Sequence, residues 1–171
     1  MAVLADGGSN SNLGASTSAA SNLVLNGGAL QYTGAAASTD RLFSVGTSGG
    51  TLDASGTGAL NLTNTGSMGF NSQSGTRTLT LTGTNTGSNT LAALVGDNGG
   101  ATSLVKSGAG TWVLTGTNAY TGTTTISAGV LQVGSGSTTG TLGSGGVTNN
   151  GSLVINRSND LTVANAKIGR A

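Results

Sequence analysis

A five-residue pattern, Gly-x-Φ-x-Φ with Φ apolar, recurs along the chain and constrains its fold more than any other feature. The copies lie at residues 28–32, 50–54, 58–62, 66–70, 110–114, 129–133 and 151–155. Because alternation at period two places the apolar side chains on one face, each copy predicts a short β-strand. The leading glycine marks the turn before that strand. Strands without the glycine are expected at 23–25, 78–81, 103–105 and 161–163.

The spacing between copies indicates how these strands are arranged. The copies that start at 28 and 50 are 22 residues apart, and those at 110, 129 and 151 are 19 and 22 apart. The copies at 50, 58 and 66 are only 8 apart. Both spacings fit a coil of about 20 residues per turn, in which near copies follow one another around a turn and distant copies stack. The sequence therefore predicts an all-β fold, a parallel β-solenoid of about eight turns whose strands stack about 4.8 Å apart.

The composition agrees with such a thin core. Charged residues make up 6% of the chain and aromatic residues 3%; there are 32 glycines but no Pro, Cys, His or Glu. Outward positions suit Thr, and Asn and Gly suit corners, where stacked Asn side chains could hydrogen-bond to one another. The missing residue types exclude disulfide scaffolds, Cys/His metal sites and catalysis by a histidine base or a cysteine nucleophile.

The rival all-β fold is an antiparallel sandwich or meander. It requires hairpin dipeptides between alternating strands. The candidates are Asn26-Gly27, Asp6-Gly7, Asn98-Gly99 and Asn150-Gly151. Asn26-Gly27 joins two strand-like runs closely enough to form a hairpin, but the spacing favours the solenoid.

The charges are few and scattered. No two of the six basic residues are adjacent, so we expect no nucleic-acid partner, which would need clustered Lys or Arg with stacking aromatics. The longest apolar run, at 91–95, is far shorter than a membrane-spanning helix, so no membrane insertion is expected. Met1 is followed by neither a basic nor an apolar segment, and no signal peptide is predicted.

Residues 104–134 carry ordered motifs with a specific spacing. These are Lys-Ser-Gly-Ala-Gly at 106–110, Leu-Thr-Gly-Thr-Asn at 114–118, Tyr-Thr-Gly at 120–122, Thr-Ile at 125–126 and Ala-Gly-Val-Leu-Gln-Val at 128–133. The stretch resembles one unit of the passenger-associated transport repeat of bacterial autotransporter passenger domains. The segments 142–146 and 150–156 are similar to the sequence that comes after this repeat in such passengers. Thr123 departs from the pattern, because the family often has a second glycine there.

The resemblance is clearest over residues 104–163, and 81–85 repeats the motif of 114–118. We expect one domain over 1–171, with degenerate repeats at 1–103, the passenger-type repeat at 104–163 and a terminal segment at 164–171. The resemblance implies a single-stranded right-handed parallel β-helix that is exported through the outer membrane, with an extracellular or cell-surface location. The C-terminal membrane barrel of such proteins is missing, so the chain is expected to be a passenger fragment.

No residue is assigned to a catalytic, cofactor or metal site. The five carboxylates are Asp6, Asp40, Asp53, Asp97 and Asp160. Some β-helix enzymes cleave acidic polysaccharides with clustered Asp and Ca²⁺, but no two of these residues are close in sequence, although two could stack on adjacent turns. The segment 96–100 is expected to be a turn, and Asp40-Arg41 a solvated corner.

The aromatic residues Trp112, Tyr120 and Tyr32 are expected to serve the core or its edges. Sugar stacking is the alternative role for Trp112. The serines lack a histidine that could activate them as nucleophiles.

The favoured function is a non-catalytic extracellular scaffold for surface display, adhesion or aggregation. Neither end, at 2–5 or at 161–168, carries Pro, Glu or a charge-rich cap, so we expect self-association by head-to-tail stacking into fibres. Cell-surface or matrix glycans are the other expected partners. The alternative function is a carbohydrate-binding or polysaccharide-cleaving β-helix, which would be indicated by a groove with paired Asp or by a row of exposed aromatics.

Overall fold

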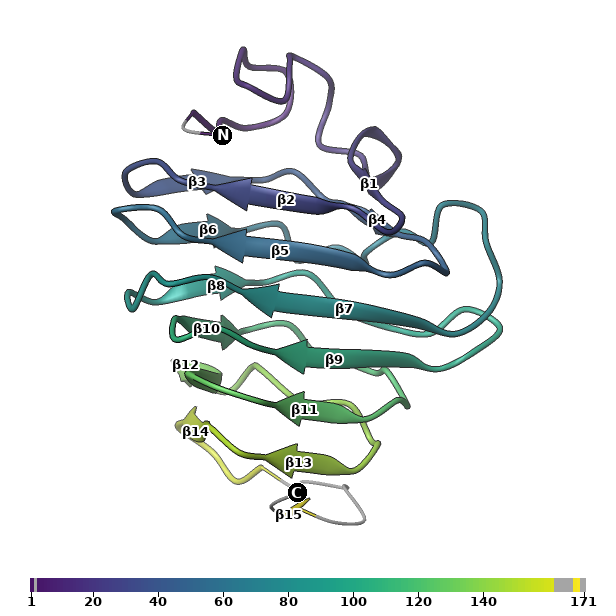
Figure 1. Cartoon of the computed structure of the whole chain (residues 1–171), viewed down its shortest axis with the longest axis vertical. Coiled ribbons are helices and arrows are strands. Elements are labelled where there is room, and N and C mark those ends of the chain that lie inside the picture. The colour runs from purple at the N-terminus through teal and green to yellow at the C-terminus, as the bar shows by residue number, and fades with distance from the viewer. Residues whose placement is uncertain (2, 162–167, 170–171) are drawn as a thin grey trace.

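The computed structural model describes residues 1, 3–161 and 168–169 of the chain. Each pair of neighbouring strands among them is parallel, and the chain coils about six times. In Figure 1 the near strands run to the left and the far strands to the right as the chain descends, which makes the coil right-handed. The predicted parallel β-solenoid is confirmed, and the antiparallel alternative is excluded.

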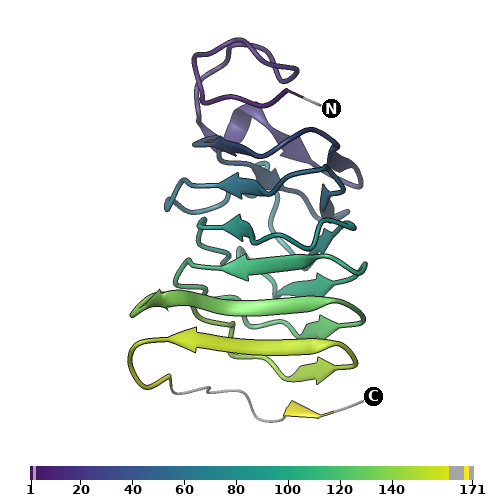
Figure 2. The same ribbon diagram turned by 90° about the vertical axis from the view of Figure 1, so that its left-hand side faces the viewer.

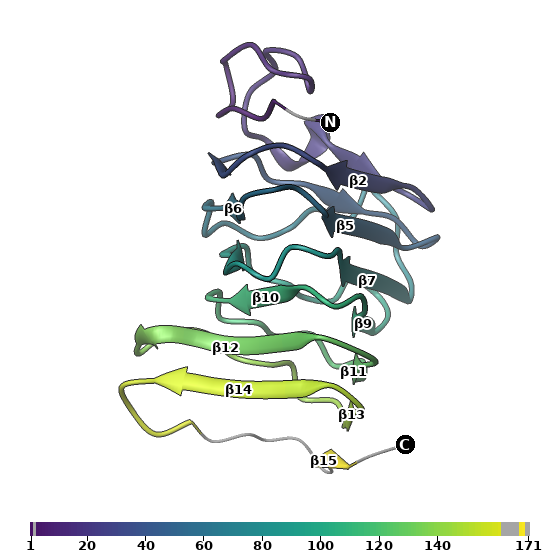
Figure 3. The ribbon, with the colours of Figure 1, turned by 60° about the vertical axis from the view of Figure 1, so that its left-hand side comes forward.

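Two large sheets form most of the wall. The seven-stranded sheet consists of β2 (Ala29–Tyr32), β5 (Gly50–Ala54), β7 (Arg77–Thr82), β9 (Thr102–Lys106), β11 (Thr124–Ile126), β13 (Val147–Asn149) and β15 (Ile168–Gly169). The six-stranded sheet consists of β3 (Ala37–Thr39), β6 (Leu60–Leu62), β8 (Asn89–Leu91), β10 (Thr111–Leu114), β12 (Val130–Ser137) and β14 (Ser152–Arg157). Figures 2 and 3 show the six-stranded sheet from outside.

The third side of the coil is less regular. It contains β1 (Val24–Leu25) paired with β4 (Ser44–Val45), and single parallel bridges join Ser44 to Gly69 and Ser67 to Leu94. A short 3-10 helix, η1 (Ala20–Asn22), precedes β1. No helix in the described part of the chain is long and apolar enough to cross a membrane.

The glycine-led pattern predicts the strands and their stacking. The copies at 110–114, 129–133 and 151–155 lie in β10, β12 and β14, which stack on one another. The copies at 50–54 and 58–62 lie in β5 and β6, which follow one another around a single turn. The copy at 66–70 forms the two bridges of the third side rather than a strand. Part of the expected strand at 161–163 lies outside the described residues.

The expected number of turns, about eight, is too high. Stacked residues are between 19 positions apart, as for Leu114 and Val133, and 29 apart, as for Leu52 and Leu81. The longest turn includes the loop between β6 and β7, where Asn71 and Ser72 have positive φ angles of 52° and 54°. The chain forms only about six coils, because the turns are longer than expected and the first strand begins at Val24.

The core is a ladder of inward side chains. In the six-stranded sheet the stacked residues are Leu62, Leu91, Leu114, Val133 and Ile155. The first four are at most 3% exposed, whereas Ile155 is 46% exposed on the last strand of that sheet. Full burial of one such side chain stabilises the fold by about 1.5–3 kcal/mol.

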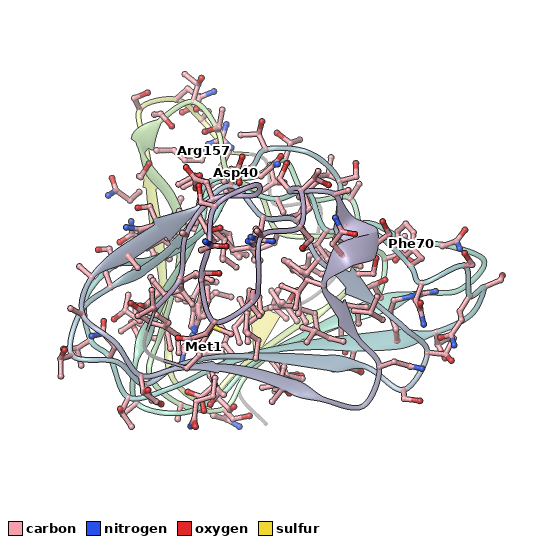
Figure 4. The ribbon with its side chains drawn as sticks, turned by 90° about the horizontal axis from the view of Figure 1, so that it is seen from above. Met1, Asp40, Phe70 and Arg157 are labelled. Atoms are coloured by element: carbon pink, nitrogen blue, oxygen red, sulfur yellow. The ribbon has the colours of Figure 1, made fainter. Side chains whose placement is uncertain are left out.

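The N-terminal end of the solenoid is covered. Residues 3–19 lie across the first coil, where Leu4 packs into the core and is 8% exposed. The Met1 ammonium donates to Gln31 O, and Thr33 N donates to Met1 O. In Figure 4, which looks down the axis from this end, Met1 lies over the cross-section of the coil. The expectation of an uncapped end at 2–5 is therefore wrong.

Candidate functional site

The aspartate side chains lie at several places in the fold, and three of them, Asp6, Asp40 and Asp97, accept hydrogen bonds from backbone amides. Asp6 Oδ1 accepts a hydrogen bond from Asp40 N at 2.9 Å, and Asp40 Oδ1 accepts one from Gly7 N at 2.7 Å. These two residues are thus brought together across 34 positions of sequence. Asp53 accepts from Gln31 and Ser55, and Asp160 is exposed. In the described part of the chain, no three His, Cys, Asp or Glu side chains gather as metal ligands.

Asp97 shows how one carboxylate joins two coils. Its Oδ1 accepts from Thr102 N at 2.7 Å, and its Oδ2 accepts from the backbone N and the hydroxyl of Thr121, 24 residues later. Burial raises the pKa of Asp97, but the hydrogen bonds from Thr121 and Thr102 outweigh this and hold it below its usual value. Gly99 follows with a φ of 66°, in keeping with the expected turn at 96–100.

The aromatic side chains expected in the core lie there. Trp112, Tyr120 and Tyr32 are at most 2% exposed. Trp112 Nε1 donates to Thr82 O at 2.9 Å, and the hydroxyls of Tyr120 and Thr124 are 2.7 Å apart. Burial raises the pKa of Tyr120. None of these three rings offers a platform on which a sugar could stack.

The basic side chains of the described residues are directed at main-chain oxygen atoms. Lys106 is fully buried, in register with Leu81 on one neighbouring coil and Ile126 on the other. Its ammonium donates to the carbonyls of Ser107, Gly108 and Ala128, at 2.6, 2.8 and 3.2 Å. Burial lowers the pKa of Lys106. One cation thus satisfies the carbonyls of two successive corners.

Arg41 corrects the expectation of a solvated corner at Asp40-Arg41. Its side chain is 4% exposed and holds the N-terminal segment over the first coil. The guanidinium donates to the carbonyls of Ala5, Asp6, Ser9 and Gly14 and to the hydroxyl of Ser16. A charged residue in an apparent loop is therefore an internal anchor here.

Arg77 and Arg157 act similarly. Arg77 is 3% exposed, and its guanidinium lies 4.8 Å from the centre of the Phe70 ring, at the corner labelled in Figure 4. It donates to the carbonyls of Val45, Phe70, Gln73, Gly75 and Asn98. Burial lowers the pKa of Arg77, and the charge of Asp97 opposes this. Arg157 donates to the carbonyls of Gly140 and Thr138.

The sequence contains a signal for two of these anchors. Arg77 alternates with Leu79 and Leu81, and Lys106 alternates with Leu104, so period two places both cations on the inward face. Stacked Asn side chains could bond to one another, but Asn118 bonds to backbone instead: it accepts from Val95 N and donates to Thr141 O.

A groove lies on the outer face of the seven-stranded sheet. It consists of two adjoining hollows of about 260 and 130 Å³. The first is lined by Thr47, Ser48, Gly49, Thr76, Arg77, Thr78, Ala101 and Ser103, and the second by Gly27, Gly28, Ser48, Gly49, Gly50, Thr51, Thr78 and Thr80. We call their union the hydroxyl groove. It crosses the beginnings of β2, β5, β7 and β9, at the right-hand end of the near sheet in Figure 1.

The fold and these surfaces define a class of protein. It is a β-solenoid in which the basic side chains of the described residues bind main-chain carbonyls at the corners of the coils, and the outer face carries hydroxyls. The comparisons supply the family. The passenger-associated-transport-repeat model matches residues 104–133. Over 160 residues, 92% of this chain, the sequence is 48% identical to the adhesin BmaC autotransporter of Brucella suis biovar 1 (strain 1330).

The chain is therefore an autotransporter passenger segment, as its motifs indicate. It spans 5% of the length of that curated relative. No solved structure matches it significantly. A segment of this type is displayed at the bacterial surface or outside the cell, which agrees with the expected location.

Proposed function

We propose that this chain is a rigid, non-catalytic segment that presents an adhesive outer face away from the bacterial cell. The observation that carries the proposal is the uninterrupted parallel ladder, in which the strands of both large sheets run through successive coils. Such a ladder keeps the outer side chains of each coil at a fixed spacing from those of the next. The similarity to a protein named as an adhesin supports the same role.

Attachment of chain-coated beads to cultured epithelial monolayers tests the adhesive role. Beads that carry the folded chain are expected to attach several-fold more than albumin-coated beads, because the hydroxyl-rich faces form many weak contacts at once. Beads that carry the heat-unfolded chain are the matched control. Equal attachment of folded, unfolded and albumin beads would contradict an adhesive role.

Self-association into fibres is the finer part of the proposal. Val154 and Ile155 are 37% and 46% exposed on β14, which pairs with β12 on one side only among the described strands. An unpaired strand edge with apolar side chains favours association. In head-to-tail stacking this strand edge would meet residues 3–19 of the next copy, which cover the other end of the core.

Electron micrographs and light scattering of the purified chain test self-association. Fibres should be present in the wild type, and Ile155→Lys should shorten or abolish them because a charge blocks the strand edge. Thr125→Lys, on the outer side of β11, is the control and should leave them intact. Monodisperse monomers of the wild type at high concentration would refute stacking.

A further inference from the structure

We propose that the hydroxyl groove binds a linear, uncharged glycan that lies along the axis of the solenoid, about one sugar to each coil. This inference rests on the proposed adhesive function and assigns it a ligand class and a location. Three features carry it: the direction of the groove, its free hydroxyls and the absence of accessible cations from its lining.

The direction follows from the topology. The two hollows share Ser48, Gly49 and Thr78, so the groove continues from the turn before β2 to the start of β9. Within it Thr51 is paired with Thr80, and Thr78 with Ser103. In each pair the two hydroxyl residues therefore lie on successive strands, about 4.8 Å apart. This spacing is close to the length of one sugar in an extended chain of β-linked pyranose rings, so two neighbouring sugars can each meet a hydroxyl of one strand.

The hydroxyls of the groove are available. Those of Ser48, Thr76, Thr78 and Ser103 form no hydrogen bond with any residue that the structure describes. Each can donate one hydrogen bond and accept others, as the hydroxyls of a sugar do. A ligand with the same mixed donor and acceptor pattern satisfies them without a charged partner.

Glycines give the groove its depth. A Cβ atom added at Gly28 would meet no other atom within 4 Å, so a side chain there would project into open space. Gly49 has a φ of 78°, and a Cβ there would come within 2.9 Å of Thr78 O. The backbone at Gly28 is thus open to a flat ligand, whereas the missing side chain at Gly49 lets the neighbouring strand approach closely.

The charges exclude an acidic ligand. Arg77 is the one cationic residue in the lining, and its guanidinium is buried and bonded to main-chain carbonyls. A carboxylated or sulfated glycan would need accessible cations to replace the water that it loses. The groove therefore selects uncharged chains. Since its lining contains no aromatic ring, we expect weak binding, with a Kd of about 1 mM.

Titration of the ¹⁵N-labelled chain with cellohexaose, followed by amide shifts, tests the site. The amides of Gly27, Gly28, Gly49 and Gly50 are expected to shift together with one Kd. Maltohexaose, which coils, should bind at least about fivefold more weakly, and a heparin hexasaccharide should leave these amides unmoved.

Two variants alter the groove in different ways. Gly28→Phe fills it, and Thr78→Val with Ser103→Ala removes two hydroxyls while keeping the size of the side chains. Each should raise the Kd for cellohexaose at least about tenfold. Thr125→Val with Thr148→Val is the matched control, because these threonines lie on the same sheet outside the groove and in register with each other. Its Kd should stay within about twofold of the wild type. Trp112 fluorescence verifies that every variant is folded.

The outcomes separate this inference from the adhesive function. Unmoved groove amides with cellohexaose, equal affinity for maltohexaose or heparin, or an unchanged Kd in both groove variants would overturn the glycan site. If the wild-type beads attach to cells and the groove variants attach equally well, adhesion stands without this site. If cellohexaose binds as expected but the beads do not attach, the glycan site stands without the adhesive role.

Discussion

Lys106 illustrates how a single residue holds two coils together. It takes a core position that Leu81 and Ile126 fill on the adjoining coils, so its hydrophobic stem packs where theirs do. Its ammonium reaches the corner, where Ser107 and Ala128 present carbonyls from successive coils. A buried carbonyl without a hydrogen-bond partner costs about 1–3 kcal/mol. The three carbonyls that the ammonium satisfies therefore offset the free energy that its desolvation costs.

Replacement of Lys106 by methionine is expected to destabilise the fold by about 1–3 kcal/mol. The apolar stem is retained, but three carbonyls lose their donor. Urea unfolding followed by Trp112 fluorescence measures the change. Thr125→Val, on the outer face of a neighbouring coil, should change the free energy of unfolding by less than about 0.5 kcal/mol. A Lys106→Met variant as stable as the wild type would show that the corner carbonyls are satisfied without the ammonium.

The same side chain gives the stability a pH dependence. Burial holds the pKa of Lys106 in the folded chain below 10.5, its ordinary value. Between these two pKa values the unfolded chain binds more protons, so the free energy of unfolding rises with pH in that interval. Above 10.0 the raised pKa of Tyr120 acts in the opposite direction. Unfolding of wild type and Lys106→Met at a series of pH values below 10 isolates the lysine, because the variant should lack the rise. Parallel curves would refute this assignment.

At the scale of the strands, prediction succeeds where inward positions are apolar. The alternation in 50–54 and 129–133 predicts β5 and β12 because apolar residues fill inward positions, Leu52 and Ala54 in β5 and Leu131 and Val133 in β12. It misses β3, β8 and β11, whose inward residues include Thr39, Asn89 and Thr124. These polar groups are buried because neighbouring coils supply partners; Asn89 Oδ1, for instance, accepts from Leu60 N. Such partners are distant in sequence, so a local pattern does not predict them.

The hydroxyl groove could not be predicted from the sequence, for a related reason. Its lining comes from four coils, and its hydroxyl residues belong to types that are abundant throughout the chain. Only the register of β5, β7 and β9 shows which of them lie side by side.

Some glycines lie where two coils approach so closely that any side chain would collide with the neighbouring coil. A Cβ at Gly143 would lie 2.1 Å from Tyr120 O and 2.3 Å from its ring. We expect Gly143→Ala to destabilise the fold by about 1–3 kcal/mol, because the coils must separate. Gly28→Ala, whose Cβ meets nothing within 4 Å, is the control and should be close to neutral. Melting temperatures of the two variants measure the difference, and equal values would contradict the packing described.

The whole molecule is a stack in which each coil contacts only its neighbours. Stability is then a sum of coil and interface contributions, and the end coils have one interface fewer. We expect the slowest amide exchange in the middle, around Leu79, Leu81 and Leu104, and faster exchange around Ile155. Hydrogen exchange read by mass spectrometry tests this gradient. Uniform protection over all coils would show instead that the solenoid opens as a single cooperative unit.

The ladder hydrogen bonds run along the rod, and this has a mechanical consequence. A pull along the long axis acts on these bonds in their own direction, so it loads one interface between coils at a time instead of shearing a whole sheet. Each coil that peels away frees the 19 to 29 residues that separate stacked positions. At about 3.4 Å per extended residue, that releases a tether of roughly 65–100 Å. A surface segment built in this way yields to tension by lengthening stepwise, and the coils that remain stay wound.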